Sequence, residues 1–393
     1  MGNGFGEWSL TNSKLPTSEH VDKTKLLQIF QNTTTSYKYL FFMALLEILE
    51  RDNFKSKTIP FDAIVHNMLA IGWYPYKYFK LSFGLVDKIP RELDKIGFES
   101  LSLSDSFTFP SHKEKLLKLL MSLNFKASDI IRYVPYRLIE PFFTGFLQKK
   151  KDGTKNTLIV SLAKEKFNEV RPFYYIDTTN KAIVLHPSWV DYLYENYELV
   201  TTFARWEWLS YMQRRNPSVP NLQAKLFPET YQPGMALQSR FWKSVIQVKP
   251  LFCIYSKQKI TLDNFSLDHF IPWSFVAHNQ LWNLIPAPLA VNSSKSNNLP
   301  SLQKYFDTYV DLQHQGLSIF HHLASSSMWK KTIEPYQVDL KMGIHEILDK
   351  NCLKKQLRST IDPLLSIASN MGFSKDWEYK SLGNNNKAVF EFQ

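Results

Sequence analysis

Apolar residues recur along most of the chain at three- and four-residue steps, a pattern that predicts helices. It is clearest after Ser36, a suitable helix cap, where Tyr39, Phe42, Met43 and Leu46 would share one helix face. A second helix start is indicated at residues 58–62. Further helices are predicted at residues 111–123, 127–131, 187–212, 302–315, 317–322 and 342–371.

Two stretches predict β-hairpins instead. Residues 148–155 centre on Asp152-Gly153 and would form a hairpin or an exposed loop, with the apolar residues 158–162 as the returning strand. Residues 173–185 alternate between apolar and polar positions around a turn at 177–180. The pattern as a whole predicts an α+β protein, mostly helical at its N-terminal end, with short hairpins.

A Pro-rich, weakly periodic segment at residues 216–234 marks the main predicted domain boundary. We expect an arm at residues 1–22 and a helical or mixed domain at 23–230, which would recognise a substrate or bind a partner. A small domain at 236–305 and a helical C-terminal extension at 306–393 would follow.

The charge of the chain favours a polyanionic partner. Its 393 residues include 47 Lys and Arg against 36 Asp and Glu, a net charge of +11. Such an excess attracts phosphate backbones and gains from counterion release, although a merely basic soluble protein would show it too. Residues 236–305 carry seven basic and two acidic side chains, so the excess is concentrated there.

The sequence also indicates a compartment. Two cysteines are too few for a disulfide framework, which favours a reducing environment. The N-terminus lacks the features of a signal peptide, and the longest strongly apolar run, residues 39–46, is too short to span a bilayer. We therefore expect a cytoplasmic protein without a membrane partner.

Candidate chemistry lies between Asp268 and Lys295. Hydrolysis of a phosphodiester needs an activated water and relief of charge on the phosphate. Asp268 and Asn292 offer oxygen ligands for one Mg²⁺ or Mn²⁺, and His269 offers a general base. Asn283 would complete the catalytic set by fixing the loop between them. Lys295 could neutralise phosphate or be an ordinary surface lysine.

This arrangement resembles the HNH (ββα-metal) endonuclease family over residues 253–300. The resemblance implies strands at 251–255 and 266–269 and a helix from Ala290 onward. It places Asp268 and Asn292 at the metal-binding positions, His269 at the general base and Asn283 at the middle Asn of the motif. The spacing is also similar to the HNH domains of RNA-guided CRISPR effectors, and the flanking helical region resembles bacterial restriction and phage-defence proteins.

Many members of that family bind a structural zinc through two pairs of cysteines. Here Cys253-Ile-Tyr-Ser256 keeps one cysteine of the first pair, and no second pair follows. We therefore expect no structural zinc, and the domain would depend on packing.

The resulting hypothesis is a metal-dependent DNA endonuclease of antiviral defence or restriction. Its DNA contacts would include Lys295, Lys257, Lys259 and Arg240. Two alternatives stay open: a nucleic-acid-binding or assembly subunit with an inactive HNH-like module, and an RNA-directed nuclease. Because an ungated nuclease would endanger its host genome, we expect a partner protein or an oligomer to control it.

Overall fold

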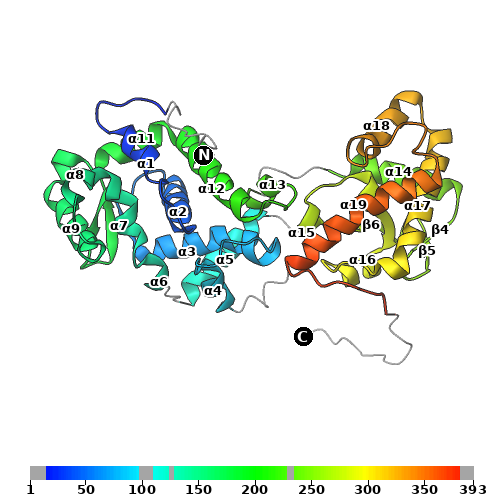
Figure 1. Cartoon of the computed structure of the whole chain (residues 1–393), viewed down its shortest axis with the longest axis horizontal. Helices are drawn as coiled ribbons and strands as arrows, with labels where there is room; N and C mark the ends of the chain where they lie inside the picture. The colour runs from blue at the N-terminus through cyan, green and yellow to red at the C-terminus, as the bar shows by residue number, and fades with distance from the viewer. Residues whose placement is uncertain (1–14, 97–108, 124–127, 228–233, 381–393) are drawn as a thin grey trace, which may run out of the picture. The chain divides into compact units, whose positions relative to one another are not determined.

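The computed structural model describes residues 15–96, 109–123, 128–227 and 234–380. The chain divides into two compact units, Met1–Pro217 and Ser218–Gln393, and each is described by itself (Figure 1). Helices predominate, with three small antiparallel sheets in the described residues, so the predicted α+β class is confirmed. Most of the predicted arm at residues 1–22 lies outside the described residues.

The core of the first unit is built around α2 (Tyr37–Arg51), α3 (Phe61–Trp73) and α12 (Tyr197–Arg215). Helix α2 follows Ser36, although the Ser36 side chain makes no capping hydrogen bond, and nine of the fifteen helix residues are buried. Strands β1 (Thr58–Pro60), β3 (Ala182–Leu185) and β2 (Tyr174–Asp177) form one sheet in that order, which confirms the hairpin predicted at residues 173–185. The other helices are α1 (Lys23–Gln28), η2 (Tyr74–Tyr78), α4 (Ile89–Asp94), α5 (Phe109–Ser122), α6 (Ser128–Ile131), α7 (Val134–Ile139), η4 (Glu140–Phe143), α8 (Thr144–Leu147), α9 (Asp152–Glu165), α10 (Phe167–Val170) and α11 (Pro187–Glu195).

The hairpin predicted at residues 148–155 is wrong, although residues 148–151 do form an exposed loop. Helix α9 begins at Asp152, inside the expected turn, and continues through the expected returning strand. Ile159, Leu162 and Ala163 are buried on one side of this helix. Their three- and four-residue spacing is helical, and it overrides the local turn signal of Asp152-Gly153.

The second unit contains the candidate chemistry. Strand β6 (Phe265–His269) pairs antiparallel with β7 (Leu284–Pro288), with Asp268 opposite Ile285 and His269 opposite Leu284. Helix α16 (Leu289–Lys295) follows β7 directly. The remaining elements are α13 (Leu222–Leu226), α14 (Ala236–Val248), β4 (Leu251–Phe252), β5 (Lys259–Ile260), α15 (Trp273–Val276), η6 (Leu281–Asn283), α17 (Leu302–Leu323), α18 (Ser326–Val338) and α19 (Lys350–Asn370).

One expected strand pair differs from the structure. The strand expected at 266–269 is present as β6, but its partner is β7 rather than residues 251–255. Those residues contribute only β4, which pairs with β5. All five residues of β7 are buried. The strand is therefore apolar on both faces and does not alternate between buried and exposed positions.

A single hydrophobic cluster runs through the second unit. It joins Phe241 and Trp242 of α14 to the buried residues of β7, α17, α18 and α19. The boundary expected between residues 305 and 306 falls inside α17, and the helices after it share this core.

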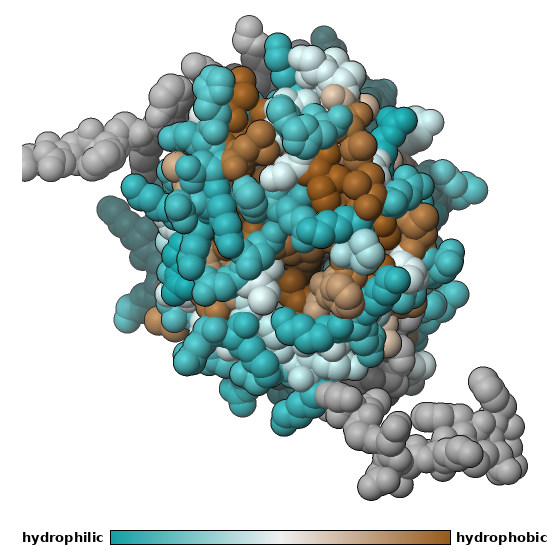
Figure 2. Space-filling model, turned by 90° about the vertical axis from the view of Figure 1, so that its right-hand side faces the viewer, coloured by the Kyte–Doolittle hydropathy of each residue, from teal (hydrophilic) through white to brown (hydrophobic). Residues whose placement is uncertain are grey.

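The exposed apolar side chains include Val248, Phe252 and Leu289, and Figure 2 shows a face on which apolar patches are separated by hydrophilic side chains. Within the described ranges, no helix is long and apolar enough to cross a membrane.

Gly316 of α17 supplies a matched test of this packing. A Cβ there would lie 3.0 Å from Trp242 and 3.1 Å from Phe241. We predict that Gly316→Ala lowers the free energy of unfolding by about 1–2 kcal/mol, because overpacking outweighs the better helix propensity of alanine. In α9, Gly153→Ala meets nothing within 4 Å. That control should leave stability equal or raise it by up to about 1 kcal/mol. Calorimetric unfolding measures both, and a stabilising Gly316→Ala contradicts the prediction.

Candidate active site

Three of the predicted residues lie on strand β6 and helix α16, which pack against each other. Asp268 and His269 end β6, and Asn292 lies on α16. The Asn292 side-chain nitrogen donates to Ser266 Oγ at 3.0 Å and to the Leu267 carbonyl oxygen at 3.3 Å. These bonds hold Asn292 beside the residues that precede Asp268. In the described part of the chain no group donates to Asn292 Oδ1, so this oxygen keeps its full capacity to accept.

The Asp268 carboxylate is buried, with an exposed fraction of 2%. Its Oδ1 lies 3.0 Å from Lys295 Nζ, and its Oδ2 accepts a hydrogen bond from the Tyr255 hydroxyl at 2.7 Å. Burial raises the pKa of Asp268, and the Lys295 ammonium and the Tyr255 hydroxyl counteract that rise. The Lys295 ammonium also donates to the His269 carbonyl oxygen at 2.6 Å. Both side chains of the ion pair are removed from solvent.

The burial of Lys295 differs from both roles that the sequence suggested for it. The sequence suggested phosphate neutralisation, or a surface lysine, but Lys295 is 0% exposed and its ammonium faces Asp268. In this conformation Lys295 positions the carboxylate and the β6 backbone. Lys257, Lys259 and Arg240 are exposed, and their contact with nucleic acid stays a prediction.

His269 is held as a neutral imidazole. Its Nε2 lies 2.9 Å from Asn279 Oδ1. Because a carbonyl oxygen only accepts, this bond places the ring hydrogen on Nε2 and leaves the lone pair on Nδ1. Burial lowers the pKa of His269 to about 4; the bond to Asn279 opposes that shift, and the nearby Lys295 charge adds to it. The ring is therefore unprotonated at neutral pH, as a general base must be.

Asn283 clamps the backbone that leaves β6. It is completely buried. Its side-chain oxygen accepts from the Ile271 N–H at 2.8 Å, and its side-chain nitrogen donates to the Ile271 carbonyl oxygen at 2.9 Å. The Asn283 side chain thus continues the hydrogen-bond pattern of the β6–β7 pair beyond the end of β6. This geometry gives Asn283 a positioning role, consistent with the expectation that it fixes the loop.

The C-terminal helices hold the other side of that loop. Gln313 of α17 donates to the Leu284 carbonyl oxygen at 3.0 Å and to those of Leu281 and Trp282 at 3.3 Å. The Tyr336 hydroxyl of α18 donates to Gln313 Oε1 at 2.8 Å, which fixes the orientation of the amide. The loop that carries Asn283 is therefore positioned from α17 and α18.

Sequence reasoning missed Tyr255, Asn279 and Gln313 as parts of this site. Tyr255 lies thirteen residues before Asp268, and Gln313 about thirty residues after Asn283. No spacing rule links them to the motif, because the contacts arise only when separate elements pack together. Asn279 lies in the loop after His269 without any local signal for a hydrogen-bond partner.

Carboxylate and amide oxygens are ligand types that a hard divalent cation accepts, and Asp268 and Asn292 are the residues that could hold one here. Asp268 and Asn292 would hold it, with water in the remaining positions, and a cation there supplies charge stabilisation for a phosphate and its leaving oxygen. Searched over the described ranges, no group of three or more His, Cys, Asp or Glu residues is arranged to hold a metal ion. The candidate set therefore depends on a single carboxylate, and both of its oxygens already have partners.

Residues 253–301 match the family model of the HNH endonucleases. The match covers β5, β6, β7 and α16, which carry the geometry described above. It confirms the recognition of the family from the motif at residues 253–300, while the likeness to CRISPR effectors stays a prediction. No curated protein and no solved structure matches the chain.

Asn283 can be tested as a clamp. We predict that Asn283→Ala lowers the free energy of unfolding by about 2–4 kcal/mol, because it leaves two buried backbone groups of Ile271 unpaired. The exposed Asn351→Ala should change stability by no more than about 0.5 kcal/mol. Urea unfolding of both variants measures the difference, and an Asn283→Ala loss as small as that of the control contradicts the clamp.

Buried histidines predict a pH dependence of stability. His278 packs near Trp282, with ring centroids 5.3 Å apart, and burial lowers its pKa to about 4, as it does for His269. In the unfolded chain both histidines take up a proton as the pH falls below about 6.5, whereas in the folded chain they do so only near pH 4. The free energy of unfolding therefore decreases as the pH drops from about 6.5 to about 4. We predict a shallower fall for the double variant His269→Gln/His278→Gln, measured by urea unfolding across this range. Equal slopes for the variant and the native chain contradict the assignment.

Proposed function

We propose that this chain, which carries an HNH endonuclease domain at residues 253–301, is a metal-dependent endonuclease that hydrolyses DNA phosphodiester bonds. The observation that supports the proposal is that Asn292 of α16 is hydrogen-bonded to Ser266 and Leu267 of β6, the strand that ends with Asp268 and His269. These residues combine a neutral base with two oxygen ligands. The cation would be Mg²⁺ or Mn²⁺, since both prefer oxygen donors.

Each residue has a role in this proposal. His269 takes a proton from the attacking water at Nδ1, because Nε2 is committed to Asn279. Asp268 and Asn292 hold the cation. Asn283 keeps the backbone after His269 in place through Ile271, so the base and the ligands keep their relative positions.

The surroundings of Asp268 support control of the activity. The carboxylate is 2% exposed and bonded to Lys295 and Tyr255, so access for a cation requires these partners to move. A partner protein, an oligomeric contact or the substrate could favour that movement. Such control fits the proposed part in restriction or antiviral defence, in which the first unit recognises the substrate or a partner.

DNA contact is proposed for the basic surface of the second unit. Lys257 lies in the turn between β4 and β5, Lys259 begins β5 and Arg240 lies on α14, and all three side chains are exposed. Exposed cations of this kind supply sequence-independent attraction to phosphate that weakens with salt.

The central test is His269→Ala. We predict that it lowers the cleavage rate by roughly 10²–10⁴-fold, since the general base is lost, while DNA binding persists. The substrates are supercoiled, linear and single-stranded DNA and RNA, each with Mg²⁺, Mn²⁺ or EDTA, and fluorescence anisotropy reports binding. His345→Ala, at an exposed position of the same unit, is the matched control.

The outcomes separate the alternatives. Full cleavage by His269→Ala removes His269 from the mechanism, and cleavage in EDTA removes the cation. Cleavage of RNA alone identifies an RNA-directed nuclease. Nucleic-acid binding without metal-dependent cleavage of any substrate identifies a binding or assembly subunit with an inactive module.

A further inference from the structure

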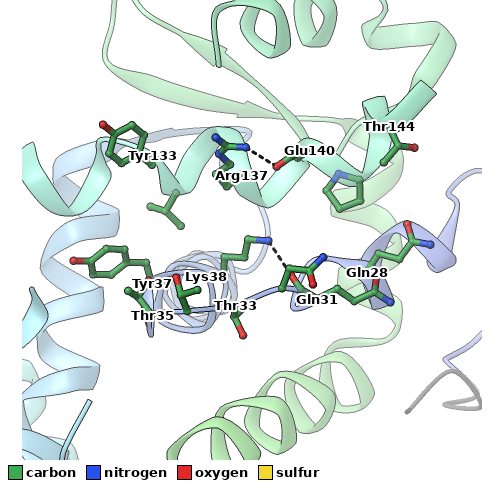
Figure 3. Close-up of a pocket in the computed structure, with 14 residues that line it drawn as sticks. Gln28, Gln31, Thr33, Thr35, Tyr37, Lys38, Tyr133, Arg137, Glu140 and Thr144 are labelled. Atoms are coloured by element: carbon green, nitrogen blue, oxygen red, sulfur yellow. Dashed lines mark hydrogen bonds and ion pairs between the residues drawn. The ribbon is translucent and has the colours of Figure 1, made fainter. Parts of the chain in front are cut away.

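A separate cleft of about 680 Å³ lies in the first unit. One wall is the segment from α1 to the start of α2, and the other is formed by α7, η4 and the start of α8 (Figure 3). This volume falls within the range of roughly 300–1,000 Å³ typical of small-molecule sites. The cleft contains none of the residues assigned to the HNH domain, so its ligand would be distinct from the nuclease substrate.

The cleft carries an incompletely neutralised cation. Lys38 extends across it, and in the described part of the chain its ammonium group has a single hydrogen-bond acceptor, the Gln31 carbonyl oxygen at 3.4 Å (Figure 3). An ammonium group has three N–H donors, so this one long bond leaves most of its capacity unused. Burial lowers the pKa of Lys38, so solvent stabilises its charge poorly; the Glu140 charge opposes this shift and the Arg137 charge adds to it.

The carboxylate that lines the cleft acts on Lys38 only through its charge, because its oxygens pair with other cations. Glu140 pairs with Arg137 at 3.1 Å, and its other oxygen lies 3.7 Å from Lys155. Two cations therefore already share this single carboxylate. The lining includes Lys38 and Arg137 against Glu140 alone, and this imbalance favours an anionic ligand.

The remaining lining is suited to a polar ligand with a planar group. Hydroxyl and amide side chains line much of the cleft, contributed by Gln28, Gln31, Asn32, Thr33, Thr34, Thr35 and Thr144. Tyr37 and Tyr133 lie at one end of the cleft and come from opposite walls (Figure 3). Aromatic side chains at such a position can stack on a nucleobase.

From this combination we infer that the cleft binds a nucleotide. The phosphate would contact Lys38, the sugar would lie among the threonines, and the base would lie against Tyr37 and Tyr133. A mononucleotide satisfies both features of the cleft, since inorganic phosphate has no group for the tyrosines and a nucleoside has no charge for Lys38.

The test is calorimetric titration of the full chain with AMP, GMP, CMP and UMP, and separately with adenosine, guanosine, cytidine, uridine and inorganic phosphate. At least one mononucleotide should bind more tightly than both inorganic phosphate and its own nucleoside. Lys38→Met should weaken that nucleotide by roughly 10–100-fold, the value of a charge-assisted hydrogen bond. The exposed Lys164→Met, on α9 of the same unit, should leave the affinity unchanged.

A second pair of variants tests the base contact. Tyr133→Leu should weaken the nucleotide by roughly 5–100-fold through lost stacking and leave inorganic phosphate unaffected. Tyr194→Leu, which alters a tyrosine that is 65% exposed elsewhere in the unit, is the control. The inference is overturned if no mononucleotide binds, if Lys38→Met binds it as tightly as the native chain, or if only a single-stranded oligonucleotide binds. Because the readout is binding, the result is independent of whether the second unit cleaves DNA.

Discussion

The buried ion pair between Asp268 and Lys295 ties β6 to α16, and the geometry of the candidate active site depends on it. Two charges are removed from water, a cost that is offset only when the remaining hydrogen-bonding capacity is also used. Here the Tyr255 hydroxyl donates to the second oxygen of the Asp268 carboxylate, and the His269 carbonyl oxygen accepts a hydrogen bond from Lys295. Asn292 lies three residues before Lys295, so both face the same strand from one side of the helix. The ion pair therefore also sets the position of the second candidate metal ligand.

A second constraint acts on the loop that joins the two strands. Asn283, within the loop, is hydrogen-bonded to the Ile271 backbone. Gln313 of α17, outside the loop, donates to three of its carbonyl oxygens, and a hydrogen bond from Tyr336 fixes the orientation of the Gln313 amide. Strands β6 and β7 have only five residues each, so their own hydrogen bonds do not extend far enough to hold the loop between them. The helices after residue 301 thus belong to the scaffold of the site, and they share its hydrophobic core.

The sequence indicates candidate residues for the site, but it does not indicate their surroundings. The spacing of Asp268, Asn283 and Asn292 is local to one strand–loop–helix segment, so a linear pattern can represent it. The partners Tyr255, Asn279 and Gln313 depend on how separate elements pack, which no spacing records. The same limit explains the errors in the fold: the turn signal at Asp152-Gly153 is local, whereas the burial of Ile159 and Ala163 that selects a helix is tertiary. It also explains why the burial of Lys295 was not foreseen.

The charge balance of the site constrains how a cation and a nucleic acid would bind. Asp268 and Lys295 neutralise one another, and Asn292 is uncharged, so a divalent cation would add two positive charges without a second carboxylate to offset them. Repulsion from the Lys295 ammonium would oppose its entry wherever water is excluded. The phosphate of a substrate carries the negative charge that would offset the divalent cation. Cation and nucleic acid are therefore expected to bind cooperatively, each removing the electrostatic cost of the other. A site of this composition would stay inactive with metal alone and would assemble only on its substrate.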